Sequence, residues 1–260
     1  MIQFSLNRFA NLAKWSLRND RRYFVKSFLQ MLVIFTLFFL FFTTATVKWN
    51  NVNANYVPCA IVVIGAFATT IVLGSSYMFY SMDGKHDMQT LLMLPASNLE
   101  KYLVRYATWI LLLPLYLVAF FAADLLQYVV NTLVGHEGAM FVTQYIAGID
   151  WGDLLGTKAN GYTGRVVFDY LMVGLWLHSL YAIGATFFRL RKHNGILTSV
   201  VLILALFLTV GIFGWPTVNC TWWNNHEFFN QLFLVLSVFN FWLSYRLFCR
   251  RQLIGKFINW

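Results

Sequence analysis

Long apolar runs alternate with short polar connectors along this chain. Six runs reach or approach the length of a membrane-spanning helix: residues 27–47, 58–80, 106–129, 168–188, 195–215 and 228–245. About 20 apolar residues are needed, because the hydrocarbon core is roughly 30 Å thick and a helix rises about 1.5 Å per residue. Open sheets are excluded, because their edge N–H and C=O groups would lack partners in lipid. The pattern predicts an all-α membrane protein with six transmembrane helices in a single transmembrane domain, residues 1–260.

A different rhythm precedes the first run, within the segment 1–26. Apolar residues recur every three or four positions on one face, and polar residues do so on another: Ile2, Leu6, Phe9, Ala13 and Leu17 against Gln3, Asn7, Asn11, Lys14 and Arg18. This predicts an N-terminal amphipathic helix lying at the membrane interface, in contact with membrane lipids. The alternative is a leader that only sets topology. No cleavable signal peptide is expected, because the first run is followed by Lys48 and Trp49 rather than small residues.

Composition and charge refine this picture. The 260 residues are 59% hydrophobic and 11% charged, with a mean hydropathy of +0.62. Nearly all Lys and Arg residues lie in the N-terminal segment, the connectors after the second and fourth runs, and the C-terminal tail. Since positive connectors stay inside, both termini and the segment 81–105 are predicted to be cytoplasmic. The net charge of +9 is thus a topology signal, and no nucleic-acid partner is expected.

The segment 81–105 is strongly specified for a connector. Asp83 or Asp87 can cap a short helix in which Met88, Leu91 and Leu92 share one face. The residue before Pro95 avoids the helical region, so this helix, residues 87–94, ends there. Ser97 and Glu100 form a capping-box pattern, S-x-x-E, which starts the next helix. The apolar stripe either docks a cytoplasmic partner or packs on the chain's own bundle or on lipid.

This segment resembles the one after the second span of type-2 ABC exporter permeases. The likeness is carried by the pattern Thr90, Leu91, Leu92, Leu94, Pro95, Ala96, Ser97 and Glu100. The six-run layout also matches. The resemblance implies a protein of the bacterial inner membrane, with a coupling helix that sits in a cleft of a separate ABC ATPase subunit. It also implies that this permease works as a homodimer or beside a similar permease. The residues it implies for coupling are Asp87, Met88, Thr90, Leu91, Leu92, Leu94, Pro95, Ser97 and Glu100.

Two departures from that family stand out. The outer connector 131–167 is long, whereas relatives usually have a short one. Relatives often place re-entrant helices between the last two spans, and the stretch 215–227 is barely long enough for them.

No catalytic motif is present in the sequence. It contains no G-x-x-x-x-G-K-[ST] loop, H-E-x-x-H pair, G-x-S-x-G elbow or C-x-x-C. We therefore expect no enzyme activity, cofactor or metal in this chain, with ATP and Mg²⁺ bound by the partner ATPase. The expected function is export of an apolar or amphipathic cargo, a lipid-like molecule or a peptide. The alternative is a non-transporting accessory or immunity-type membrane protein.

Three ionisable residues fall within or beside the runs. His178 lies midway along the fourth run, on a ridge with Gly174, Ala182 and Thr186, and either makes an interhelical hydrogen bond or lines a pathway. Asp124 and Asp169 either meet water or mark an outer vestibule. A second ridge, formed by Ala66, Thr70 and Gly74, predicts close helix packing, either within the chain or across a dimer. Cys59 and Cys220 both fall near the outer face, where they either pair or remain free.

Overall fold

The computed structural model describes residues 4–45, 55–80, 89–91, 93–135, 139–150, 163–188, 193–213 and 226–250. Within these ranges five helices are long and apolar enough to cross a membrane: Arg21–Thr44, Val57–Phe79, Asn98–Leu133, Gly164–Phe187 and Glu227–Cys249. The chain is therefore an all-α integral membrane protein.

These five helices confirm five of the six predicted runs. The first is α2 (Arg21–Leu40), which continues into the π-helix η1 (Phe41–Ala45). The second is α4 (Val57–Leu73), which tightens into the 3₁₀-helix η2 (Gly74–Phe79). The others are α6 (Asn98–Leu133), α9 (Thr163–Phe187) and α11 (His226–Cys249).

The fifth predicted run falls on α10 (Asn194–Phe213). The apolar stretch of α10, Asn194–Leu208, is shorter than the five helices named above. A sixth membrane-spanning helix therefore stays a prediction. The predicted N-terminal helix is confirmed as α1 (Leu6–Asn19). Leu12 and Ser16 are its buried residues, while Leu6 and Leu17 are exposed.

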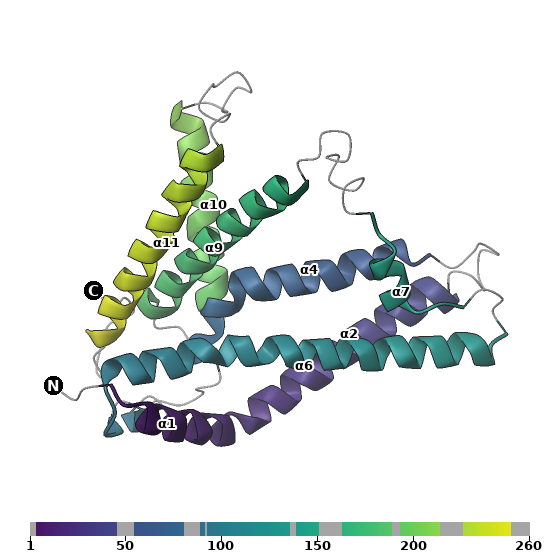
Figure 1. Ribbon diagram of the computed structural model, residues 1–260, viewed down its shortest axis with the longest axis horizontal. Helices are drawn as coiled ribbons and strands as arrows, with labels where there is room; N and C mark the ends of the chain where they lie inside the picture. The colour runs from purple at the N-terminus through teal and green to yellow at the C-terminus, as the bar shows by residue number, and fades with distance from the viewer. Residues whose placement is uncertain are drawn as a thin grey trace. The chain divides into compact units, whose positions relative to one another are not determined.

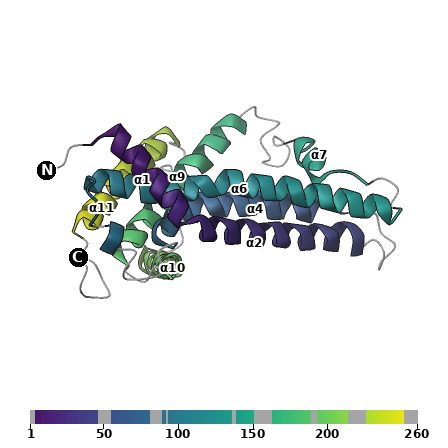
Figure 2. The same ribbon diagram turned by 90° about the horizontal axis from the view of Figure 1, so that it is seen from below.

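The chain divides into two compact units. The first comprises Met1–Arg18, Ile71–Trp109 and Gly164–Trp260. In it α9, α10 and α11 lie side by side (Figures 1 and 2). Its core is a cluster of six buried residues: Met78, Phe79, Leu91, Tyr102, Ala185 and Phe248.

Close backbone packing accompanies this core. A Cβ on Gly74 would lie 2.8 Å from ring atoms of Trp109, and a Cβ on Gly184 would collide with Thr198 of α10. The predicted close packing at Gly74 is therefore confirmed within the chain. A Cβ on Gly174, by contrast, meets nothing within 4 Å.

The second unit comprises Asn19–Thr70 and Ile110–Thr163. It contains α2, η1, most of α4, the longer part of α6 and α7 (Val142–Ala147). In Figure 2 the parts of α2, α4 and α6 that belong to this unit run side by side. The core is rich in aromatic rings, and Phe120 meets Phe35 and Phe39 edge to face at 6.3 and 6.2 Å between centroids. Cys59 is buried in this core, and Cys220, its proposed partner, lies outside the described residues.

Candidate functional site

The predicted coupling segment is only partly covered by the described residues. Asp87, Met88 and Leu92 lie outside them, whereas residues 89–91 and 93 are helical and 94–96 form a bend. The helix therefore ends next to Pro95, as predicted. Pro95 itself is exposed.

Leu91 does not form part of an exposed stripe. Its side chain is fully buried in the core of the first unit, and Leu94 packs against the same cluster. Of the two alternatives that helical periodicity leaves open, the structure therefore places Leu91 on the chain's own bundle. In the described part of this segment the large apolar side chains of Met93 and Leu99 are exposed, Met93 more so, at 77%.

The predicted capping box is confirmed at the start of α6. The Ser97 N–H donates to Glu100 Oε2 at 2.7 Å, and the Glu100 N–H donates to Ser97 Oγ at 3.2 Å. This reciprocal pair satisfies two N–H groups that would otherwise lack helical partners. It makes α6 begin at Asn98, eight residues before the predicted apolar run.

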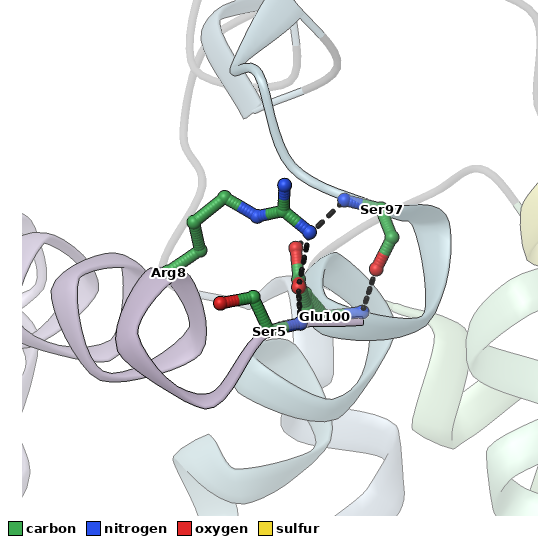
Figure 3. Close-up of polar contacts among 4 residues, drawn as sticks. All are labelled: Ser5, Arg8, Ser97 and Glu100. Atoms are coloured by element: carbon green, nitrogen blue, oxygen red, sulfur yellow. Dashed lines mark hydrogen bonds and ion pairs between the residues drawn. The ribbon is translucent and has the colours of Figure 1, made fainter. Parts of the chain in front are cut away.

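Glu100 also holds the N-terminal helix (Figure 3). Its Oε1 accepts the Ser5 N–H at 2.6 Å and Nη2 of Arg8 at 3.2 Å. The carboxylate is fully buried while the Arg8 side chain is 39% exposed. Two backbone donors and a guanidinium thus compensate the burial of one negative charge. We call Ser5, Arg8, Ser97 and Glu100 the Glu100 node.

A second contact between α1 and α6 lies about one and a half helical turns further along α6. Arg105 is fully buried and donates from Nη2 to the Ser16 hydroxyl. Tyr102 lies between Glu100 and Arg105 in the sequence, and its hydroxyl donates to the Ser244 hydroxyl of α11 at 3.1 Å. The first turns of α6 are therefore connected to α1 and α11 through buried polar contacts. The sequence offered no signal for these partners, because their separations exceed 80 residues.

A shallow pocket of about 760 Å³ lies beside the Glu100 node. Ser97, Asn98 and Leu99 line one side of it, and Trp242, Tyr245 and Arg246 of α11 line another. The Arg246 guanidinium lies 5.4 Å from the centre of a Trp242 ring, a cation–π distance. Aromatic and cationic side chains of α11 therefore lie together beside the end of the segment 81–105.

His178 is buried at the centre of a second polar cluster in the first unit. Its Nδ1 lies 2.5 Å from the Ile71 carbonyl oxygen, and its Nε2 lies 2.8 Å from the Tyr106 hydroxyl. Because a carbonyl only accepts, Nδ1 carries a hydrogen; in the neutral imidazole Nε2 then accepts from the Tyr106 hydroxyl. The Ser75 hydroxyl donates to the His178 carbonyl at 2.6 Å. The structure therefore gives His178 interhelical hydrogen bonds to α4 and α6.

Asp124 lies in the second unit and caps α7. Its carboxylate accepts the Val142 N–H at 2.8 Å, the Thr143 N–H at 3.0 Å and the Thr143 hydroxyl at 2.6 Å. It is 2% exposed, so the expectation that it simply meets water is wrong. A carboxylate at a helix N-terminus stabilises the free N–H groups there. Asp124 thus fixes part of the predicted outer connector 131–167 against α6.

Asp169 makes a contact between α9 and α11. Asn230 Nδ2 donates to its Oδ1 at 2.6 Å. Asp169 is half-buried, unlike Asp124. The three ionisable residues singled out from the sequence are therefore not brought together: His178 and Asp169 each bind other helices of the first unit, and Asp124 belongs to the second.

No metal centre is formed by the described residues, among which no three His, Cys, Asp or Glu side chains are grouped to hold an ion. Comparison of the chain with protein-family models, curated proteins and solved structures found no match.

Proposed function

We propose that this chain is the membrane-spanning permease subunit of an ATP-driven exporter, energised by a separate ATPase. The observation that carries the proposal is the Glu100 node. A coupling segment must transmit the movement of the ATPase to the transmembrane helices. Its end therefore has to be fixed to those helices. The node fixes the start of α6 to the α1 segment through two hydrogen bonds to Glu100, from the Ser5 N–H and from Arg8. A third, from the Ser97 N–H, holds the bend before α6 to the same carboxylate.

The buried position of Leu91 supports the same proposal. Leu91 joins the coupling segment to Phe79 at the end of η2 and to Phe248 at the end of α11. A close-packed core transmits displacement, because it has few voids to absorb it. Force applied at Met93 would therefore reach η2, α6 and α11 together. The permeases would act as a pair, with the amino-terminal ends of α2 and α6 in the cytoplasm.

The cargo proposed for this exporter is apolar or amphipathic. Large apolar side chains are exposed along the spanning helices, among them Ile61, Val118 and Val235. A sugar-like cargo would require polar exposed side chains at membrane depth. Transport is tested in proteoliposomes that contain the permease and its ATPase, with fluorescent lipids and peptides as cargo and ATP as the trigger.

Co-purification of the ATPase tests the coupling assignment. Tagged full-length chain is isolated from its native membranes, and an ATPase carrying a phosphate-binding loop is sought among the bound proteins. Met93→Asp places a charge on the exposed part of the segment and should abolish this association. Leu91→Asp is unsuitable, because it buries a charge in the core.

Leu133→Asp is the matched control, because Leu133 is 81% exposed and lies at the other end of α6. It should leave the association intact. Association that survives Met93→Asp would show that the coupling assignment is wrong. A wild-type chain that binds no ATPase would favour the accessory membrane protein instead.

A further inference from the structure

A groove opens along the first half of α2 in the second unit. Its volume is about 1060 Å³, and Tyr116 of α6 forms part of its wall. Three cations line the end near the start of the helix, Arg21, Arg22 and Lys26. Leu29, Val33 and Ile34 line the part further along.

The order of these residues matches an amphiphile. The distance along the helix from Arg22 to Ile34 is about 18 Å at 1.5 Å per residue. Over that distance the lining changes from guanidinium and ammonium groups to branched alkyl groups. A molecule with an anionic head and a hydrocarbon tail would place each part against its complement.

The cations of the groove are free to bind an anion. Arg21, Arg22 and Lys26 are exposed, and none of them takes part in an ion pair with another described residue. The adjacent carboxylate, Asp20, is buried and makes a contact of its own. This end of the groove therefore carries positive charge that no described residue compensates by an ion pair, at the end of a membrane-spanning helix.

We propose that this groove holds an anionic phospholipid from the bilayer leaflet on that side. Its phosphate lies among Arg21, Arg22 and Lys26, and one acyl chain follows Leu29, Val33 and Ile34. A zwitterionic lipid is the poorer occupant, because its quaternary ammonium would face the same three cations. The site does not depend on the proposed exporter function, since its residues belong to the second unit and the coupling segment belongs to the first.

Native mass spectrometry of the full-length chain tests this proposal. The purified protein is titrated with equal amounts of phosphatidylglycerol and phosphatidylcholine that carry the same acyl chains. The first bound lipid should be phosphatidylglycerol, by a factor on the order of ten. The variant R22Q/K26Q should reduce that preference to about twofold or less, since it removes two of the three cations.

The variant K14Q/R18Q is the matched control. It removes one Lys and one Arg, also four residues apart, from exposed positions on α1, and should keep the full preference. An unchanged preference in R22Q/K26Q, or an equal loss in K14Q/R18Q, would overturn the proposal.

Ile34→Trp examines the acyl part of the groove while keeping every cation. The added ring fills the space beside Val33 and should lower the number of bound phosphatidylglycerol molecules by about one. Far-UV circular dichroism of each variant checks that the helices are retained. A folded Ile34→Trp variant that binds as many lipids as the wild type would show that no acyl chain lies there.

Discussion

The two compact units use the same helix, α6, in different ways. In the second unit α6 contributes Phe120 and Ala123 to an aromatic core, and its buried carboxylate, Asp124, accepts only from neutral donors of α7 among the described residues. In the first unit α6 begins with a buried carboxylate, Glu100, that accepts from a cation as well. One helix thus carries two buried carboxylates, one with neutral hydrogen-bond donors beside an aromatic core and one with a cationic donor.

Packing contacts and buried hydrogen bonds make residues sensitive to different substitutions. A shape-based core is sensitive to lost volume, because its neighbours cannot collapse fully into a cavity. A polar core is sensitive to a lost partner, because the group left behind is buried without a hydrogen bond. Substitutions that remove volume and substitutions that remove a hydrogen-bond partner should therefore differ in the size of their effects on stability.

Removal of an aromatic ring from the second unit should have the largest effect. Phe39 is fully buried and stacks with Phe35 at 5.8 Å between centroids. We expect Phe39→Ala to lower the free energy of unfolding by about 2–4 kcal/mol, below the usual range for water-soluble cores because lipid also solvates the ring. Equilibrium unfolding in mixed detergent micelles measures the change.

Phe41→Ala is the control on the same stretch of helix. Phe41 is half exposed, so its loss should change the free energy of unfolding by about 0.5 kcal/mol or less. Equal losses for the two substitutions would mean that the second unit does not depend on its aromatic core.

Replacement of Asp124, the buried carboxylate that accepts from neutral donors of α7, should have the next largest effect on stability. Asp124→Asn keeps the shape but offers an amide N–H₂ where an acceptor of the Thr143 N–H and hydroxyl is needed. We expect a loss of about 2 kcal/mol in the free energy of unfolding. Hydrogen exchange at the amides of α7 should rise, while exchange in α1 stays unchanged.

Asp169→Asn serves as the comparison for this prediction. Asp169 is half-buried and accepts from Asn230 through Oδ1, which an asparagine can still do. Asp169→Asn should therefore lower the free energy of unfolding clearly less than Asp124→Asn. If Asp124→Asn left α7 exchange at the wild-type rate, Asp124 would not be the cap of that helix.

Close packing in the first unit predicts a smaller effect. Gly184→Ala places a methyl group against Thr198, whose side chain must move. Overpacking of this kind should cost about 1–2 kcal/mol in the free energy of unfolding. Gly174→Ala on the same helix, with open space at its Cβ, should be neutral or slightly stabilising. A thermal shift assay of both variants gives the difference, and a reversed order would contradict the packing of α9 on α10.

The sequence predicted those features of both units that depend on neighbouring residues. The apolar runs gave the long helices, because length and composition alone decide whether a helix can cross lipid. The Ser97–Glu100 box was predictable, since its partners are three residues apart and the hydrogen bonds are local.

Contacts between distant segments could not be predicted in this way. Glu100 meets Ser5 and Arg8 across more than 90 residues, and His178 meets Tyr106 across 72. Asp124 caps a helix that begins 18 residues later and is only six residues long, too short for a periodic signal. The spacing of Leu91 relative to the other apolar residues of its helix is the same whether it faces a partner or the chain's own core. Only the structure shows which of the two it packs against.

The smallest expected effect concerns the cation of the Glu100 node. Arg8→Gln removes an ion pair whose Arg side chain is 39% exposed. Because exposed charges are screened by water and salt, hydrogen exchange in α1 should rise no more than about fivefold. Glu100→Gln should raise it further, since a glutamine amide cannot accept the Ser5 and Ser97 N–H groups together without turning its own donor toward one of them. Addition of 1 M salt should bring the wild type toward Arg8→Gln but not toward Glu100→Gln. If the two variants exchanged alike, the ion pair rather than the backbone donors would hold α1, and the node would be as sensitive to salt as an ordinary surface pair. Lys14→Gln, an exposed cation on the same helix, controls for the change in charge and should leave the exchange of α1 as in the wild type.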